Sequence, residues 1–170
     1  MSIVKFKVES EDPNHHWDYL VVKDQVVLDL GCGKHFLEEG MQTTPEFFIG
    51  KGAKKIIGVD PHIDDIRYFQ EKLPESLFIK DCILSADHLD SYMNNYDVTA
   101  VKIDIEGHER HLVESLSEYQ NIKHMAIETH SRDLFHDVMM RLLELGFNIT
   151  HVATFYPRVY DVCNLIFASR

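Results

Sequence analysis

The sequence predicts an α/β fold, in which a mostly parallel β-sheet carries helices on both of its faces. Three observations support this prediction. From Val26 onward, short apolar runs alternate with segments of helical periodicity, which is typical of a parallel sheet. Several of these runs end in glycine or aspartate, as strands do before a ligand-binding loop. Finally, two strand-like runs near the C-terminus are separated by only a few residues, which is too short for a parallel crossover and indicates an antiparallel hairpin.

The predicted strands are the apolar runs that end at glycine, proline or charged residues. The first, "VVLDL", is short and almost entirely apolar, so we expect it to be buried on both sides of the sheet. Five such runs lie at 26–30, 54–60, 76–80, 98–104 and 122–128, and the hairpin adds 147–155 and 161–168, joined through Tyr156-Pro157-Arg158.

Helices are predicted between the strands, where apolar residues recur three and four positions apart. Proline is favoured at the first helical position, because its missing N–H is not needed there. Five helices are predicted. The first starts at Thr44-Pro45, the second contains Ile63, Ile66, Phe69 and Leu73 and ends before Pro74, and the third covers 85–93 with Ser85 as its cap. The fourth contains Leu112, Val113 and Leu116, and the fifth runs from Leu134 to Gly146.

Length and composition predict one globular domain at 26–170, preceded by an N-terminal arm at 1–25 that holds one strand at most. The chain has 170 residues, of which 45% are hydrophobic and 26% charged. It shows neither an apolar run long enough for a membrane span nor a signal peptide, and its three cysteines suit a reducing cytoplasm. The net charge of −11 argues against nucleic acid as a partner and favours a small neutral or cationic molecule.

Glycine and aspartate residues mark the ends of the first three predicted strands. Gly31 and Gly33 flank Cys32 in the first strand-to-helix turn, where missing side chains let a ligand approach the backbone. A turn that only packs the next helix is the alternative. Asp60, with Pro61 behind it, ends the second strand and is placed to bind ribose hydroxyls. The pair Asp81-Cys82 follows the third strand.

Two common phosphate-binding motifs do not fit this loop. A P-loop needs G-K-[ST] after its spacer, and the sequence has none there. A dinucleotide fingerprint needs a third glycine where the chain has Phe36. The strand–helix–strand start keeps a nicotinamide-dependent reductase as an alternative to the function below, although Phe36 disfavours it. A module that binds the cofactor without catalysis is a further alternative.

"VVLDLGCG" followed by "IIGVD" resembles the first two motifs of class I S-adenosylmethionine-dependent methyltransferases. "VKIDIEGHE" (101–109), with "IET" (127–129) one strand later, is similar to the signature region of the FkbM branch, many members of which methylate oxygen. The resemblance covers roughly 24–168. It implies a Rossmann-like sandwich with a seven-stranded sheet, in which the strands lie in the order 3-2-1-4-5-7-6 and strand 7 is antiparallel.

The resemblance also implies a function and a cofactor site. The chain is expected to transfer a methyl group from S-adenosyl-L-methionine, in line, to a small-molecule acceptor, with a hydroxyl oxygen as the acceptor atom. Asp29, Gly31 and Gly33 would surround the methionine part of the cofactor, Asp60 the ribose, and Asp81-Cys82 the adenine. The full expected set of cofactor-binding residues is Asp29, Gly31, Cys32, Gly33, Asp60, Pro61, Asp81, Cys82 and Asp104.

Four ionisable residues are predicted to converge where the fourth and fifth strands end. Asp104 and Glu106 are two apart, as are Glu128 and His130, and residues two apart on a strand share a face. We assign these four residues as the candidate catalytic group and assign no metal ligand. Three interpretations remain open: a general base for the acceptor, a divalent-cation site, or a purely structural role in capping and pairing.

Two further features carry alternatives. His108 and His111 are three apart on a predicted helix and could share a metal, although surface exposure explains them equally simply. In "HHWDY" (15–19), the aromatic residues either cover the cofactor as a lid or pack the arm onto the sheet. Acceptor recognition falls to this arm, to the loop at 34–44, or to the partner in a homodimer.

Overall fold

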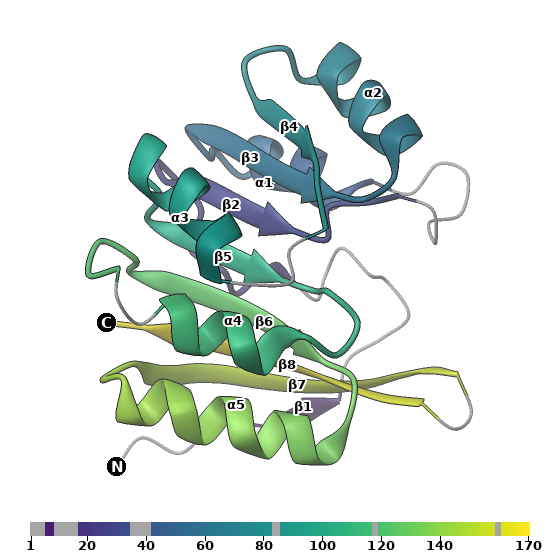
Figure 1. The fold of residues 1–170 in the computed structure, drawn as a ribbon. Helices are drawn as coiled ribbons and strands as arrows, with labels where there is room; N and C mark the ends of the chain where they lie inside the picture. The colour runs from purple at the N-terminus through teal and green to yellow at the C-terminus, as the bar shows by residue number, and fades with distance from the viewer. Residues whose placement is uncertain (1–5, 9–16, 35–41, 83–85, 117–118, 159–160) are drawn as a thin grey trace.

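A computed structural model describes residues 6–8, 17–34, 42–82, 86–116, 119–158 and 161–170. Its centre is an eight-stranded sheet with the order β1-β7-β8-β6-β5-β2-β3-β4 (Figure 1). The strands are β1 (Phe6–Val8), β2 (Val26–Leu30), β3 (Lys55–Asp60), β4 (Leu77–Lys80), β5 (Ala100–Ile103), β6 (His124–Thr129), β7 (Asn148–Arg158) and β8 (Asp161–Ser169).

The predicted strand order is confirmed. Strands β2 to β6 pair in parallel, whereas β8 runs antiparallel to both β6 and β7. Counted from β2, the order is the expected 3-2-1-4-5-7-6 with the seventh strand antiparallel. The N-terminal strand β1 adds an edge to this sheet by pairing in parallel with β7.

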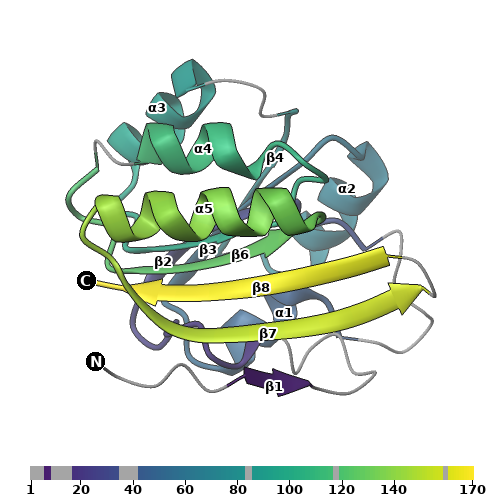
Figure 2. The same ribbon diagram turned by 90° about the horizontal axis from the view of Figure 1, so that it is seen from below.

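Helices cover the two faces of the sheet and enclose one apolar core on each side. On one face, α3, α4 and α5 pack on a core that includes Leu28, Ile57, Val101 and Ile127 (Figure 2). On the other face, α1 and α2 pack on a second core, which Trp17, Leu20 and Val22 of the N-terminal segment complete. The helices are α1 (Thr44–Gly50), α2 (Ile63–Lys72), α3 (Ala86–Asn95), α4 (Glu109–Leu116) and α5 (Arg132–Glu144).

Local sequence signals explain where the helices begin. Thr43 and Glu46 form a reciprocal capping box before α1, with Pro45 in the first turn. The Ser131 side chain accepts the Leu134 N–H at the start of α5. The predicted cap Ser85 lies outside the described residues, as does Phe36. Among the helices of the described segments, none is both long and apolar enough to cross a bilayer.

A close backbone contact requires glycine at position 31. Gly31 has a φ of +77°, and a Cβ added there would collide with the carbonyl oxygen of Asp104. The turn after β2 therefore lies directly against the end of β5. Packing against Asp104 is enough to explain this glycine, whether or not a ligand also approaches it.

A buried lysine joins the same two strand ends. Lys102 on β5 is 1% exposed, and its Nζ lies 2.6 Å from the Gly31 carbonyl oxygen and 3.1 Å from Asp29 Oδ1 on β2. The indole of Trp17 lies over the ammonium at 5.1 Å. Burial alone would lower the pKa of Lys102, but the carboxylates of Asp29 and Asp104 outweigh it and raise this pKa, so the lysine remains charged.

Gly31→Ala tests the close contact, with Gly146→Ala as its control. Gly146 also has a positive φ, of +82°, but open space surrounds its missing Cβ. We expect Gly146→Ala to cost about 1 kcal/mol of unfolding free energy from the left-handed backbone alone, and Gly31→Ala about 3 kcal/mol or more. Urea unfolding followed by circular dichroism measures both, and equal losses would contradict the collision.

Lys102→Met tests the buried ion pair, since it leaves the Asp29 carboxylate without its partner. We expect a loss of about 3–5 kcal/mol in unfolding free energy, and partial recovery when Asp29→Leu is added. The control is Lys51→Met, which removes a half-exposed lysine paired with Asp18 and should cost about 1 kcal/mol at most. A loss for Lys102→Met as small as the control's would show that the pair does not stabilise the fold.

Candidate functional site

The ends of β2, β3 and β4 meet at one edge of the sheet, because these neighbouring strands are parallel. The Gly33 N–H donates to Asp60 Oδ2 at 2.8 Å, which ties the glycine turn to the acid of the next strand. The Asp81 N–H in turn donates to the Asp60 carbonyl oxygen at 3.2 Å. The glycine turn and the two acids are thus side by side, as the sequence predicts.

The carboxylates of Asp60 and Asp81 have fixed orientations. Asp60 Oδ1 accepts the His62 N–H at 2.8 Å, so each of its oxygens has a backbone donor. Asp81 Oδ1 accepts the Cys82 N–H, and Oδ2 accepts the hydroxyl of Tyr92 on α3 at 2.6 Å. Two acids held in this way at adjacent strand ends can present their remaining lone pairs to hydroxyl or amino groups of a ligand.

The other predicted cofactor residues fall into two groups. Asp29 and Cys32 are fully buried beneath the turn, where Asp29 pairs with Lys102. Pro61 and Cys82 are exposed at the strand ends. Their roles toward a cofactor stay predictions.

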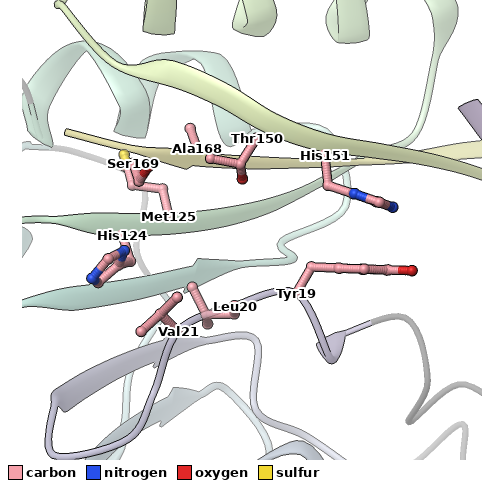
Figure 3. Close-up of a pocket in the computed structure, with 9 residues that line it drawn as sticks. All are labelled: Tyr19, Leu20, Val21, His124, Met125, Thr150, His151, Ala168 and Ser169. Atoms are coloured by element: carbon pink, nitrogen blue, oxygen red, sulfur yellow. The ribbon is translucent and has the colours of Figure 1, made fainter. Parts of the chain in front are cut away.

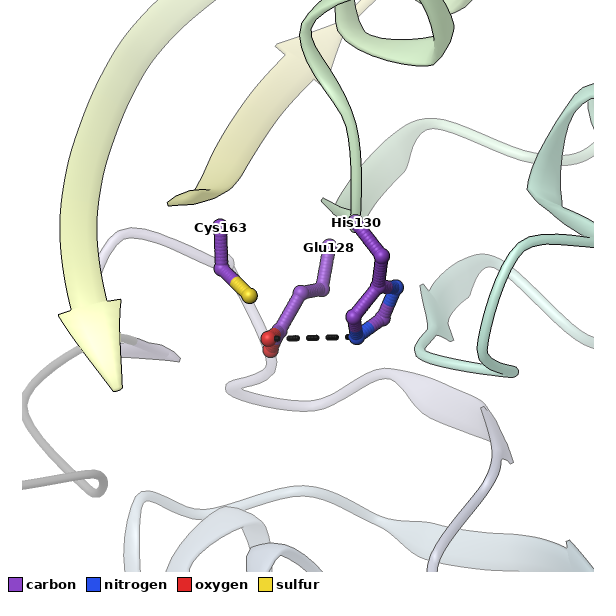
Figure 4. A group of neighbouring side chains, drawn as sticks. All are labelled: Glu128, His130 and Cys163. Carbon is purple, nitrogen blue, oxygen red and sulfur yellow. Dashed lines mark ion pairs between the residues drawn. The ribbon is translucent and has the colours of Figure 1, made fainter. Parts of the chain in front are cut away.

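The four candidate catalytic residues converge on one ring. Nε2 of His130 lies 3.5 Å from Glu128 Oε1 and 3.6 Å from both Asp104 Oδ1 and Glu106 Oε2. Glu128 belongs to β6, His130 follows that strand, and Asp104 and Glu106 follow β5. The backbone of Glu106 has a φ of +56°. Figure 4 shows Glu128, His130 and Cys163 of β8 gathered together.

Glu109 is a member of this group that the sequence analysis did not single out. Its carboxylate is fully buried and lies 3.1 Å from Nδ1 of His130, and it also accepts the Gly107 N–H at 3.0 Å. Although burial opposes it, the hydrogen bonds from His130 and Gly107 lower the pKa of Glu109. Its position seven residues after Lys102, within "KIDIEGHE", was the available signal.

The surroundings of His130 shift several other pKa values. Burial would lower the pKa of His130, but the hydrogen bond to Glu109 and the charges of Glu128, Asp104 and Glu106 raise it to about 9. Burial and the charge of Asp104 raise the pKa of Glu128 to about 8. Burial and the neighbouring Glu128 raise the pKa of the Cys163 thiol to about 12. Carboxylates therefore outnumber the cations available to them here.

Two sets of side chains in the described segments have the spacing to hold a metal ion. They are Asp104, Glu106 and His130 on the one hand, and Glu128, His130 and Cys163 on the other. Neither set includes His108 or His111, which are both exposed.

A cavity of about 340 Å³ adjoins His130. It lies between the first turns of α4 and α5, with Leu134 providing an apolar side chain. Arg110 and Asp137 form an ion pair of 2.9 Å across these two helices. A small molecule in this cavity would have the His130 ring in its wall.

A second cavity, of about 200 Å³, lies at the opposite edge of the sheet, where β6 begins and β8 ends (Figure 3). Tyr19 borders it and stacks on His151 of β7, with ring centroids 3.5 Å apart. Trp17 is buried, whereas Tyr19 is 36% exposed. Trp17 packs in the apolar core, and Tyr19 contacts the sheet through His151 of β7 and Phe167 of β8.

Comparison with known proteins places this geometry in a family context. A family model described as "Methyltransferase FkbM domain" matches residues 67–149, which include "KIDIEGHE" and His130. None of the curated proteins matches the chain in a sequence search.

Solved methyltransferase structures share the fold. TrmK of M. capricolum, in complex with S-adenosyl-homocysteine, is 14% identical with a TM-score of 0.67, and the match covers 96% of this chain and 69% of that one. Magnesium protoporphyrin IX methyltransferase of Synechocystis is 15% identical with a TM-score of 0.61, covering 88% and 76%.

A third structure is Sp1610 of Streptococcus pneumoniae, a putative tRNA (m1A22) methyltransferase, at 14% identity and a TM-score of 0.61. That match covers 88% of this chain, which spans 65% of the length of Sp1610. The resemblance that the sequence indicates is confirmed: the chain has the fold of class I methyltransferases, and its residues 67–149 match the FkbM methyltransferase domain.

Proposed function

We propose that the chain is an S-adenosylmethionine-dependent methyltransferase that methylates a hydroxyl oxygen of a small molecule. The alignment of Gly33, Asp60 and Asp81 at one edge of the sheet, next to the group around His130, is the observation that carries this proposal. We call the turn and acids at the ends of β2, β3 and β4 the cofactor half of the site, and the ionisable residues around His130 its chemical half. The contact of Gly31 with Asp104 would join these two halves.

The described residues fit an adenosine-containing cofactor. Asp60 follows a central strand and is oriented by two backbone N–H groups, so it can accept hydrogen bonds from ribose hydroxyls. Asp81 follows the neighbouring strand β4, and we propose that it meets the base. Asp29 acts through Lys102, which binds the Gly31 carbonyl and so holds the shape of the turn.

When bound, S-adenosylmethionine supplies a methyl group on a sulfonium, so that the acceptor oxygen forms the new C–O bond as the C–S bond breaks and its electron pair stays on sulfur. The protein holds the acceptor in line with that methyl group and excludes water, which can lower the barrier by several kcal/mol. Asp104, Glu106, Glu128 and His130 are the proposed acceptors of the hydroxyl proton. Because the pKa of Glu128 is raised to about 8 and that of His130 to about 9, these two can accept it only once they have lost their own protons, toward alkaline pH.

The cavity beside His130 supports a small acceptor. Its volume of about 340 Å³ is in the range of small-molecule sites. The net charge of −11 disfavours an RNA backbone, although one of the similar structures, Sp1610, is named as a putative tRNA methyltransferase. The three free cysteines favour a cytoplasmic location, and a homodimer partner remains a further proposal for the acceptor side.

Asp60→Asn tests the cofactor site. Losing charged hydrogen bonds to two hydroxyls should weaken S-adenosylmethionine binding about 100-fold. The dissociation constant can be measured by calorimetry or by the fluorescence of Trp17, the sole tryptophan, which lies over Lys102. Asp64→Asn, an exposed change on the following helix, should leave the affinity unchanged. Unchanged binding by Asp60→Asn, or tighter binding of NAD(P), would overturn the proposal.

Glu128→Gln and His130→Asn test the chemical half. Each should lower kcat for methyl transfer about 10²–10⁴-fold, because the acceptor hydroxyl loses its route for the proton. The dissociation constant for S-adenosylmethionine should not change. Formation of S-adenosyl-homocysteine over a panel of small hydroxyl compounds is the readout, and His136→Asn on the exposed face of α5 is the control. Wild-type kcat in both variants would assign these residues a structural role.

A further inference from the structure

The geometry points to a binding site for a divalent transition-metal cation, with Asp104, Glu106 and the Nε2 atom of His130 as its ligands. This inference rests on the proposed function for the role of the cation, which would orient the acceptor oxygen, but not for its binding.

The spacing of the three proposed ligand atoms suits a shared metal cation better than direct hydrogen bonds between the side chains. Nε2 of His130 lies 3.6 Å from an oxygen of Asp104 and 3.6 Å from an oxygen of Glu106. Both distances exceed a hydrogen bond, which for such charged pairs is about 2.7–2.9 Å. Atoms bonded to one cation at about 2.1 Å lie about 3.0–3.5 Å apart. All three ligand atoms lie within 4.8 Å of one another, so side-chain shifts of up to about an ångström would bring them to these distances.

The second nitrogen of His130 is fixed as it is in metal sites. Nδ1 lies 3.1 Å from the fully buried carboxylate of Glu109, which also accepts the Gly107 N–H beside Glu106. A histidine that binds a metal usually gives its other ring N–H to such a partner, which turns the free nitrogen toward the ion. Glu109 thus orients the imidazole and holds the loop that carries the neighbouring ligand.

The surrounding charges favour a cation, and the ligand types indicate which kind. Lys102, whose ammonium lies 3.5 Å from Asp104, already binds Asp29 and the Gly31 carbonyl. Glu128 adds a further carboxylate, 3.5 Å from Nε2. Imidazole suits transition-metal cations such as Zn²⁺ and Fe²⁺, whereas Mg²⁺ and Ca²⁺ take oxygen ligands, so one imidazole with carboxylates indicates a transition-metal cation. Mn²⁺, which also binds carboxylates, serves as its paramagnetic probe.

The alternative set of Glu128, His130 and Cys163 is less suited. Cys163 is 4% exposed, and its thiol is a hydrogen-bond partner of Glu128. Glu106, by contrast, has 70% of its side chain exposed, which gives an ion a path to the first set and leaves room for water or an acceptor.

Mn²⁺ titration of the ligand-free full chain, followed by loss of the free-ion EPR signal, tests the site. We expect one saturable Mn²⁺ per chain. Asp104→Asn and His130→Asn should each weaken binding at least about tenfold, and Glu109→Gln about 10–100-fold through the orientation of the imidazole. Glu106→Gln changes a surface residue and leaves the core intact, and it should also weaken Mn²⁺ binding about tenfold. Glu114→Gln, on the exposed face of α4, is the matched control and should bind as the wild type does.

Three results would overturn the inference. The first is the absence of saturable binding, and the second is binding that Glu106→Gln and Glu114→Gln affect equally. The third is a thiolate absorption band in the Co²⁺ complex that Cys163→Ser removes, which would move the ion to the alternative set. Because S-adenosylmethionine is absent from these titrations, their failure leaves the Asp60→Asn test of the methyltransferase unaffected.

Discussion

The contact between the turn after β2 and the end of β5 is the constraint on which the rest of the site depends. Gly31 has no side chain, so its backbone can lie against the Asp104 carbonyl, and Lys102 binds both the Gly31 carbonyl and the Asp29 carboxylate across the same junction. A charged lysine without solvent is stable only with such partners. The junction sets the distance between the proposed cofactor half on β2, β3 and β4 and the chemical half on β5 and β6.

The positions that follow from strand periodicity were predictable from the sequence. Parallel strands place their carboxyl ends at one edge, which brings Gly33, Asp60 and Asp81 together, and the two-residue repeat brings Glu128 and His130 to one face. The predicted turn and acids are therefore adjacent, and the four predicted ionisable residues do meet. Their assignment to cofactor and catalysis is a proposal that these positions support.

The remaining members of the site depend on contacts that sequence periodicity does not encode. Glu109 begins α4 and turns inward because the backbone at Glu106 and Gly107 has positive φ values. Cys163 reaches Glu128 through the antiparallel register of β8 on β6, which pairs Glu128 with Leu165 and Thr129 with Asn164. Such register depends on which face of each strand is buried and on the geometry of the turn between β7 and β8, and the two-residue period alone does not give it. Lys102 pairs with Asp29 because β2 and β5 are neighbours, which only the strand order reveals.

Within the group around His130, the charged form of Glu128 is costly for the ligand-free fold, whereas those of His130 and Glu109 are stabilised by their neighbours. Several carboxylates face one imidazole, and the pKa of Glu128 is raised because burial and the charge of Asp104 disfavour its ionised form. Glu128 belongs to neither of the two apolar cores. A carboxyl whose ionised form is disfavoured and that adds nothing to core packing is typical of a functional site. What relieves the repulsion is positive charge, and an imidazolium, a sulfonium or a bound metal ion would each supply it at the same edge of the sheet.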